Sequence, residues 1–301
     1  MRFLFCNDDF ESQDVDPCFA MEANAVSTLE LKYDLIDFNA LRSQNIEQAV
    51  RFVTKAQKIE NAIYRGWMLT PEEYQLLYRG LKQQNVTLIN SPDEYRHCHW
   101  LSESFSIIKE ITPKSVFLPF TGAPDYSAVM DALKPFGNSP IIVKDYVKSQ
   151  KHKWFDACYI PDATDESHVK RVTSHFIELQ DVFLQGGLVF REFIKFESLG
   201  NHPKSGMPIT LEFRLFVVDG SIVATIPYWE AEYSSKQPLT DHLVTILENV
   251  KSNFFSCDVA KTINDEWLII ELGDGQVSGI PESGNIKLFY EQLINSLDNK
   301  E

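Results

Sequence analysis

The chain has 301 residues, of which 44% are hydrophobic and 24% are charged, and these are ordinary values for a globular protein. This length allows two or three subdomains, each with its own core. The formal net charge of −15 argues against a general binder of nucleic acids or anionic membranes, because such proteins neutralise phosphates with clustered Lys and Arg. A basic site within one cleft remains compatible with it.

The cysteines and the first residues predict where the protein works. The five cysteines are odd in number and widely spaced, without a Cys-x-x-Cys pair, which fits reduced thiols better than a disulfide framework. The segment after Met1 turns acidic too soon for a signal peptide, and no apolar run is long enough to span a bilayer. We therefore expect a cytoplasmic protein that contacts neither membrane nor nucleic acid.

Residues 1–112 predict an open α/β domain, because strand and helix patterns alternate along them. Strand patterns occupy residues 2–6, 33–38, 62–69 and 86–89. A helical pattern covers residues 18–32, and residues 45–60 fit a helix or a mixture of helix and strand. A clear helix begins after Thr70, the N-cap, with Pro71 at its first position and two glutamates behind it, and it ends near Gln84.

The pattern changes after Pro113, where short strands surround fewer helices. Strands are expected at residues 116–119, 140–146, 156–160, 188–196, 210–218 and 221–228, and in a hairpin over residues 254–271. Helices are expected at about 126–134, 165–180, 239–252 and 285–297. The composition of residues 200–208 predicts a loop.

Two acidic residues lie within the hairpin of residues 254–271. A turn centred on Asn264-Asp265 places Asp258 opposite Glu271. The same register predicts two further opposed pairs, Thr262 with Trp267 and Ala260 with Ile269. Opposed side chains lie about 4.5–5.5 Å apart at Cβ, where like charges destabilise a sheet. A shared Mg²⁺ or Mn²⁺ explains the acidic pair, since both ions take few carboxylates plus phosphate oxygens. The alternative is a solvated edge strand or a shifted register.

Lysines follow the strand pattern of residues 140–146. Lys144 ends an apolar run, where an ammonium loses solvation and needs an anion such as phosphate, unless it reaches back to solvent. Asp145 points to the opposite strand face and is not its obvious partner. The basic segment 148–153 contains Lys148, Lys151 and Lys153. It could close over an anionic ligand, or form a solvated turn.

Two arginines occupy hydrophobic strand patterns. Arg191 precedes Glu192-Phe193-Ile194, and Arg214 shares one strand face with Glu212. An arginine in a hydrophobic strand is costly unless its guanidinium binds a carboxylate or a phosphate. Either a ligand phosphate or a structural Arg–Glu pair within the sheet would account for each of them.

The order of these features resembles the ATP-grasp superfamily, and most closely its branch with two arginines and one lysine, the R2K clade. The order is a strand-end lysine, a basic loop, a helix, Arg-Glu-Phe-Ile, Glu-Phe-Arg and an Asp…Glu hairpin, over about residues 114–282. The resemblance implies an α/β (α+β) fold, in which an α/β domain precedes an ATP-grasp unit. Its expected parts are residues 1–112, a lid subdomain of residues 113–187 and a C-terminal subdomain of residues 188–301.

The resemblance also implies roles for individual residues. Lys144 matches the lysine that holds nucleotide phosphates, and Arg191 and Arg214 match the strand arginines that face phosphates or activated substrate. The segment Glu192-Phe193-Ile194 is similar to the hinge that grips adenine and ribose. The magnesium-binding acids correspond to Asp258 and Glu271.

One position departs from the family pattern. Many ATP-grasp enzymes have an asparagine two residues after the metal-binding glutamate, whereas Gly273 stands there in this chain, followed by Asp274. Either Asp274 serves as a further metal ligand or the metal site is weaker. Arg65, at a strand end of the first domain, is a separate prediction for the group that anchors a substrate carboxylate.

The implied activity is that of an ATP-dependent, Mg²⁺-dependent ligase. ATP would phosphorylate a carboxylate, and an amine or similar nucleophile would then displace phosphate from the acylphosphate. Either substrate could belong to a peptide or protein. The alternatives are an assembly or adaptor protein that holds ATP without such turnover, and an α/β binding module whose charged residues are structural pairs.

Overall fold

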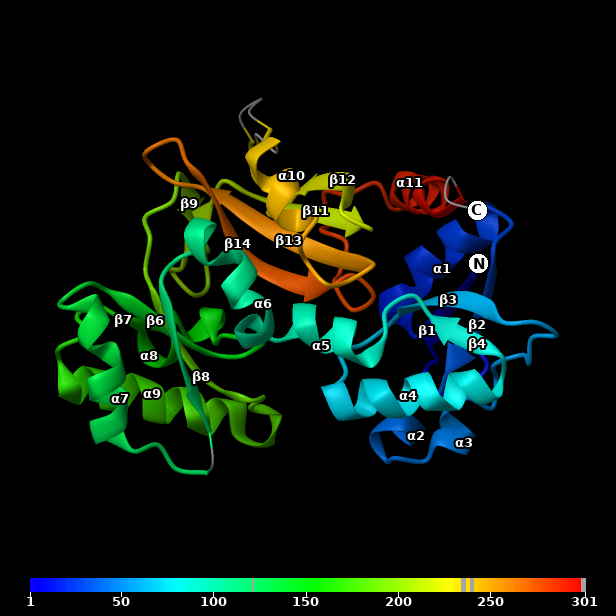
Figure 1. The fold of residues 1–301 in the computed structure, drawn as a ribbon, viewed down its shortest axis with the longest axis horizontal. Helices are drawn as coiled ribbons and strands as arrows, with labels where there is room; N and C mark the ends of the chain where they lie inside the picture. Colours follow the sequence, from blue (N-terminus) through cyan, green and yellow to red (C-terminus); the bar gives the residue numbers. More distant parts are fainter. Residues whose placement is uncertain (121, 234–236, 239–240, 299–301) are drawn as a thin grey trace.

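The computed structural model describes residues 1–120, 122–233, 237–238 and 241–298. Within them, the strands form three four-stranded sheets and one two-stranded sheet, and helices pack around these sheets. Figure 1 shows the N-terminal domain on the right, a lid subdomain at the lower left and the C-terminal sheet above and between them. The α/β (α+β) class predicted from the sequence is therefore confirmed. No described helix combines the length and apolar character needed to cross a membrane.

The N-terminal domain is an open parallel sheet in the order β2-β1-β3-β4. Its strands are β1 (Arg2–Cys6), β2 (Lys32–Ile36), β3 (Glu60–Arg65) and β4 (Val86–Leu88). Its helices are α1 (Ala20–Thr28), α2 (Phe38–Arg42), α3 (Ile46–Ala49) and α4 (Pro71–Gln83). Every residue of β1 is buried, as expected for a parallel strand covered by helices on both faces.

The start of α4 agrees with its predicted signals. The Thr70 hydroxyl accepts from the Glu73 N–H at 3.2 Å, and the Glu73 carboxylate accepts from the Thr70 N–H at 2.8 Å, with Pro71 at the first position. This reciprocal pair satisfies two backbone donors that a helix start otherwise leaves unpaired.

Two helices that the sequence interpretation missed connect the N-terminal domain to the rest. These are α5 (Pro92–His99) and α6 (Leu101–Ile108). Side chains from both helices, including Cys98, Leu101 and Ile108, join the core of the C-terminal sheet. Helix α5 carries the same capping box as α4, formed by Ser91 and Glu94, so the signal was present in the sequence.

The lid subdomain is an antiparallel sheet in the order β5-β8-β6-β7. Its strands are β5 (Ser115–Pro119), β6 (Ile141–Asp145), β7 (Tyr159–Ile160) and β8 (Gly187–Glu192), and its helices are α7 (Tyr126–Leu133), α8 (Trp154–Ala157) and α9 (Glu166–Gln180). The strand expected at residues 156–160 is shorter, because α8 takes its first part. Since β8 pairs with β5 and β6, the lid sheet extends past the expected boundary at residue 187.

The C-terminal sheet is antiparallel in the order β12-β11-β13-β14. Its strands are β11 (Glu212–Val218), β12 (Ser221–Pro227), β13 (Phe254–Lys261) and β14 (Trp267–Asp274). Helix α10 (Asp241–Leu247) corresponds to the helix expected at 239–252, whose residues 239–240 lie outside the described residues. Part of the expected loop 200–208 instead forms a small hairpin of β9 (Ser198–Asn201) and β10 (Pro208–Thr210).

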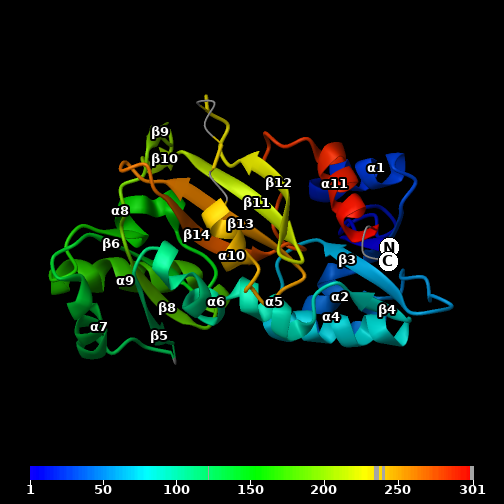
Figure 2. The same ribbon diagram turned by 45° about the horizontal axis from the view of Figure 1, so that its top comes forward.

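The last helix, α11 (Ile286–Asp298), packs on the N-terminal domain although it follows the C-terminal sheet in the chain (Figure 2). The Tyr290 ring lies edge-on to Phe3 of β1 at 5.1 Å, and the Tyr290 hydroxyl donates to Glu22 of α1 at 2.5 Å. One core therefore contains both ends of the chain. Helix α11 also packs on β11 and β12, so it lies between the N-terminal domain and the sheet of the expected C-terminal subdomain, residues 188–301.

Candidate active site

The hairpin β13–β14 places Asp258 opposite Glu271, as the sequence predicts. The register between this pair and the turn differs, because Lys261 rather than Thr262 faces Trp267 and Leu268 rather than Ile269 faces Ala260. A β-bulge after Asp258 compensates for that shift of one residue, so the two carboxylates still end on the same face.

Asp258 is held by an arginine of the neighbouring strand. Arg214 of β11 pairs directly with Asp258, donating from Nε at 2.8 Å and from Nη2 at 2.7 Å. Its guanidinium also lies 4.9 Å from the ring centroid of Tyr228. Burial raises the pKa of the Asp258 carboxyl, and Arg214 opposes that shift. For Arg214, burial acts to lower the pKa, but Asp258 outweighs it and the pKa lies above its ordinary value.

Glu271 is held by a lysine from the lid. The Lys144 Nζ on β6 donates to Glu271 Oε2 at 3.0 Å, and Lys144 is buried. Burial acts to raise the pKa of Glu271, but the Lys144 ammonium lowers it to about 2. Four charged side chains from two different sheets thus meet here. We call them the charged cluster: Lys144, Arg214, Asp258 and Glu271. Each carboxylate has a cationic partner, which offsets the repulsion expected of opposed acids.

Arg191 borders this region but uses its guanidinium differently. It donates to the Ile270 carbonyl and the Thr112 hydroxyl, and more weakly to the Ile269 carbonyl at 3.3 Å. Burial lowers the pKa of Arg191 to about 10. The Ile269 and Ile270 carbonyls belong to the bulged part of β14. The hydrogen bonds of Arg191 therefore connect the lid sheet to the C-terminal sheet.

A cavity of about 290 Å³ lies between these two sheets. The predicted hinge residues Glu192, Phe193 and Ile194 line it, together with Arg191 and Lys151. Apolar side chains from both sheets and from the β9–β10 hairpin form much of its wall, namely Ile142, Trp154, Met207 and Trp229. A cavity with aromatic and aliphatic walls suits an aromatic ring system.

Glu212 is a functional candidate that the sequence interpretation did not select. It is buried in the wall of this smaller cavity, where Oε2 accepts from Trp229 Nε1 at 3.2 Å, while Oε1 has no hydrogen-bond partner among the residues that the structure describes. Burial raises the pKa of Glu212 to about 7, and Lys151 opposes that shift. The shared strand face of Glu212 and Arg214 was the signal that could have found it.

The basic loop, residues 148–153, lies between the smaller cavity and a larger one of about 700 Å³. Lys151 lines the smaller cavity, Lys148 and Gln150 line the larger, and Lys153 is exposed and lines neither. Burial acts to lower the pKa of Lys151, but nearby carboxylates, Glu212 foremost, raise it above its ordinary value.

The larger cavity lies between the N-terminal domain and the lid, and the loop after β14 forms part of its wall. Gly279 of that loop accepts from Arg214 Nη1 at 2.8 Å. A single arginine side chain therefore spans from Asp258 to the wall of the larger cavity. None of the four cluster side chains lines either cavity, but each cavity has a lining residue beside the cluster. Gly279 of the larger cavity accepts from Arg214, and Ile270 of the smaller cavity precedes Glu271 in the chain.

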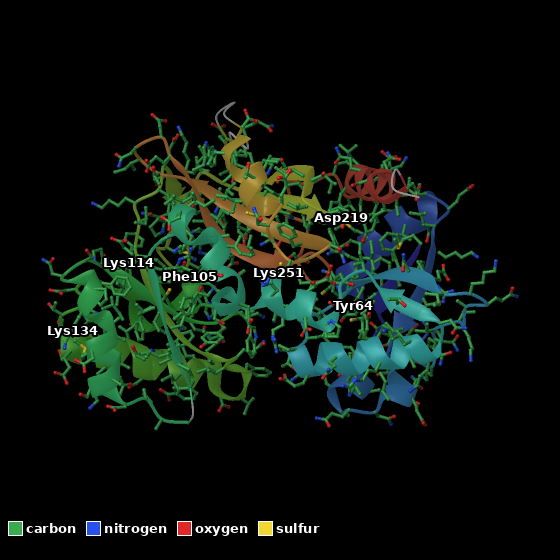
Figure 3. The ribbon with its side chains drawn as sticks, in the orientation of Figure 1. Tyr64, Phe105, Lys114, Lys134, Asp219 and Lys251 are labelled. Carbon is green, nitrogen blue, oxygen red and sulfur yellow. The ribbon has the colours of Figure 1, made fainter. Side chains whose placement is uncertain are left out.

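Arg65 does not have the free guanidinium that anchoring a substrate carboxylate requires. It is buried, binds Glu22 through Nε at 2.9 Å and Nη2 at 3.1 Å, and donates from Nη1 to the carbonyls of Gly275 and Ser278. Because these protein groups occupy its donors, we assign Arg65 to the junction between domains. Tyr64, labelled in Figure 3, joins the same junction, since its N–H donates to Gln276 Oε1 at 3.2 Å.

Asp274 also lies apart from the acidic pair. Alternation along β14 turns it to the opposite face from Glu271, where it is fully buried. It accepts from Asn90 Nδ2 at 2.6 Å and from the Gln276 N–H at 2.9 Å. The prediction that Asp274 adds a third metal ligand is therefore corrected: it binds the segment that precedes α5.

Gly273 lies on the same face of β14 as Glu271, and neighbouring atoms leave no space for a side chain at this position. A Cβ built there would meet the Ser256 and Ser278 hydroxyl oxygens at 2.8 Å each, and these two hydroxyls hydrogen bond to one another at 2.7 Å. A longer side chain at this position would require both serines to move. Among the described residues, Asp258 and Glu271 therefore have no third acidic, histidine or cysteine side chain beside them that could bind a metal ion.

Two carboxylates fit Mg²⁺ when phosphate oxygens complete its coordination, because this ion usually takes one or two carboxylates. No three His, Cys, Asp or Glu side chains in the described part of the chain gather closely enough to hold a metal ion. An ion at Asp258 and Glu271 would thus depend on a phosphate-bearing ligand.

Comparison with known proteins identifies the family. The family model of the ATP-grasp domain, R2K clade family 3, matches residues 134–293, more than half of the chain. The chain belongs to the ATP-grasp superfamily, and within it to this branch of the R2K clade. A search of curated proteins found no match.

Solved structures share the fold over nearly the whole chain. The ATP-grasp ligase PsnB, complexed with minimal precursor, Mg and ADP, has 10% identity and a TM-score of 0.57, covering 98% of both chains. D-alanine–D-alanine ligase from Bacillus anthracis, complexed with ATP, has 15% identity and a TM-score of 0.58, covering 99% of this chain and 97% of that one. The macrocyclase MdnC, bound with precursor peptide MdnA from Microcystis aeruginosa, has 12% identity and a TM-score of 0.55, covering 98% and 100%.

Proposed function

We propose that the protein is an ATP-dependent ligase that joins a carboxylate to an amine through an acylphosphate, with Mg²⁺ as its metal. Family membership and the fold shared with ATP-grasp ligases support an enzyme of this kind. The observation that carries the proposal is one charged cluster whose direct neighbours line two separate cavities, Gly279 the larger and Ile270 the smaller. Two cavities of different character are what a reaction between a nucleotide and a second substrate requires.

The smaller cavity is the proposed nucleotide site. The base would lie among Trp154, Met207 and Trp229, against the hinge of residues 192–194. The unpartnered Oε1 of Glu212 would accept a hydrogen bond from a ribose hydroxyl. Lys144 and Lys151 would then meet the phosphates, and Lys148 and Lys153 would act from the loop above them.

The charged cluster would perform the transfer. An oxygen of the substrate carboxylate attacks the γ-phosphorus of ATP, and the bond to the ADP oxygen breaks. The amine nitrogen then attacks the acyl carbon, phosphate leaves with the bonding electron pair, and the amine loses a proton. Arg214 would hold the acylphosphate oxygens, and Lys144 and Arg191 would supply fixed positive charge to the same site. Mg²⁺ on Asp258 and Glu271 would offset the charge of the phosphate oxygens.

Within the lid subdomain, the basic loop is proposed as the segment that covers this site. Because it separates the two cavities, it can shield the acylphosphate from water while both substrates are bound. The second substrate would enter the larger cavity, and a peptide or protein is a reasonable donor of the carboxylate, the amine or both. The five cysteines, all free, fit a reducing cytoplasmic setting.

A second function is supported by the small number of side chains available to bind a metal ion. Gly273 stands where many relatives have asparagine, and Asp274 faces away, so the metal has two carboxylates at most from this face. A protein that binds ATP as an assembly or adaptor factor, without ligating small substrates, would tolerate such a site.

Thermal melting with nucleotides tests the proposal. We expect Mg-ATP to raise the melting temperature of the wild type, because a ligand at about 100 times its Kd stabilises by about 2.7 kcal/mol. The Asp258→Asn/Glu271→Gln variant should lose that shift. ADP release that requires both a carboxylate and an amine would favour the ligase over the adaptor. An unaltered shift in the double variant would remove the metal assignment.

A further inference from the structure

The larger cavity has an unusual rim of exposed apolar side chains. Of the large hydrophobic residues that are exposed in the described chain, five line this one cavity, namely Trp67, Met68, Leu179, Val182 and Phe183. We call these five the apolar rim. Their exposed fractions include 80% for Val182 and 61% for Phe183. Apolar side chains gathered at one site in this way mark a surface that another molecule covers.

The apolar rim belongs to two walls that face each other across the cavity. Trp67 and Met68 follow β3 in the N-terminal domain, whereas Leu179, Val182 and Phe183 lie at the end of α9 and just beyond it in the lid. Arg42 of α2 crosses between these walls, since its guanidinium lies 5.6 Å from the ring centroid of Phe183. A ligand held here would contact both bodies at once.

The charged side chains of this wall leave one cation without an ion-pair partner among the described residues. Of the lining cations that the structure describes, Arg65 is bound to Glu22, and Arg42 lies 3.5 Å from Glu73, which also accepts from the Thr70 N–H. Lys148 forms no ion pair with any residue that the structure describes. In a protein of net charge −15, such a wall complements an acidic rather than a basic ligand.

The size of the cavity favours a ligand larger than a free amino acid. Its volume of about 700 Å³ is more than twice that of the smaller cavity, and it opens to the surface at the apolar rim. Its lining includes the exposed residue Gly279, whose carbonyl accepts a hydrogen bond from Arg214. A chain molecule could therefore place a carboxylate near Arg214 and a neighbouring side chain against the rim.

We propose that the larger cavity binds a peptide in which an Asp or Glu carboxylate is flanked by an aromatic or long aliphatic side chain. This inference rests on the proposed ligase function and names the class of its carboxylate substrate. The acidic group would be directed to Arg214 and Lys148, and the apolar side chain would lie between Met68 and Phe183. Burial of one such side chain commonly changes affinity about tenfold or more.

Selection from a display library of random peptides tests this proposal. The immobilised protein is saturated with Mg²⁺ and a non-hydrolysable ATP analogue. We expect enrichment of peptides with Phe, Trp, Leu or Met beside Asp or Glu, and ADP release when a selected peptide and an amine are supplied with ATP. The variants Val182→Ser/Phe183→Ser and Met68→Ser should bind a selected peptide about tenfold or more weakly.

The exposed residue Ile59 provides a matched control, since it lines neither cavity and Ile59→Ser should bind as the wild type does. Enrichment of basic peptides, no enrichment, or unchanged binding by the rim variants would overturn the proposal. The rim variants should retain the thermal shift with Mg-ATP. A wild type that shows this shift but selects no peptide would refute the peptide site alone, whereas absence of the shift would refute the proposed function itself.

Discussion

Lys144 and Glu271 form a buried ion pair between the lid and the C-terminal sheet, so either side chain alone is an uncompensated charge. Loss of one member of a buried pair commonly costs about 3–5 kcal/mol, and we expect about 2 kcal/mol here because Glu271 keeps some exposure. Lys144→Met should therefore destabilise the protein strongly, and Lys144→Met/Glu271→Gln should recover most of the loss. Urea unfolding of the wild type, both single variants and the double variant measures the coupling.

The stability that the Lys144–Glu271 pair contributes depends on pH in a defined direction. The folded-state pKa of Glu271, about 2, lies below its ordinary value, so the pair stabilises fully above about pH 4.5 and less as the pH falls towards 2. The difference between wild type and Lys144→Met should narrow over that range. Neither the single nor the double variant should release ADP at more than about one hundredth of the wild-type rate. Additive effects of the two substitutions on stability would contradict the pairing.

At the scale of residues, the sequence predicted which side chains matter better than it predicted their partners. Alternation placed Arg214 on a definite strand face, and turn chemistry placed Asp258 opposite Glu271. That β11 lies beside β13 could not be derived, because strand order depends on the whole fold. The sequence analysis assigned a metal to these acids but did not predict that Arg214 and Lys144 pair with them. Asp274 and Arg65 were misassigned since burial and long-range partners leave no local pattern.

At the scale of elements, the packing of α3 against α4 gives a prediction that runs against helix propensity. Gly80 lies within α4, where replacement by alanine commonly stabilises a helix by about 1 kcal/mol. Here an added Cβ would lie 2.3 Å from Ile46 Cγ1 on α3. We expect Gly80→Ala to lower the free energy of unfolding by about 1 kcal/mol or more, because overpacking outweighs propensity.

Chemical denaturation of three variants separates the two effects. Gly80→Ala and Ile46→Ala should each destabilise the protein, and the double variant should be more stable than the sum of the two changes predicts, because Ile46→Ala removes the obstructing atoms. A Gly80→Ala variant as stable as the wild type would show that α3 shifts without cost.

The elements themselves were largely predictable where local chemistry fixes them. The N-cap at Thr70 and the shared face of Phe213, Leu215 and Val217 in β11 depend on a few residues each, and the structure agrees with both. The bulge in β14 was not predictable, because Arg191 from another sheet binds the carbonyls that it displays. The small β9–β10 hairpin was interpreted as a loop since its strands are short and rich in Gly and Pro.

At the scale of the whole molecule, the N-terminal domain and the C-terminal sheet are joined by a buried polar network around Asp274. Asn90, which precedes α5, donates to Asp274 and to the Phe254 carbonyl, and its own carbonyl accepts from the Asn253 and Phe254 N–H groups. With α11 packed on β1, this network fixes the N-terminal wall of the larger cavity relative to the sheet that carries Arg214. The alignment of the two cavities therefore depends on this junction.

The charge of Asp274 makes the junction sensitive to pH. Burial raises the pKa of Asp274 to about 7 from its ordinary value near 3.8, while Asn90 and Gln276 oppose that shift. Since the folded-state pKa is the higher one, the protein loses stability as the pH rises from about 4 through 7, and the loss is complete above that range. In Asp274→Asn this part of the pH dependence should disappear.

Melting temperatures between pH 5 and pH 8 measure the effect. The wild type should fall further over this range than Asp274→Asn does, by about 3 °C or more, since about 1 kcal/mol shifts the melting temperature of a chain of this size by about 2–4 °C. Asp14→Asn, a substitution of an exposed acid in the loop after β1, is the matched control and should parallel the wild type. Parallel curves for all three proteins would mean that Asp274 stays ionised at the junction throughout. In that case its hydrogen bonds, rather than its titration, would hold the domains together.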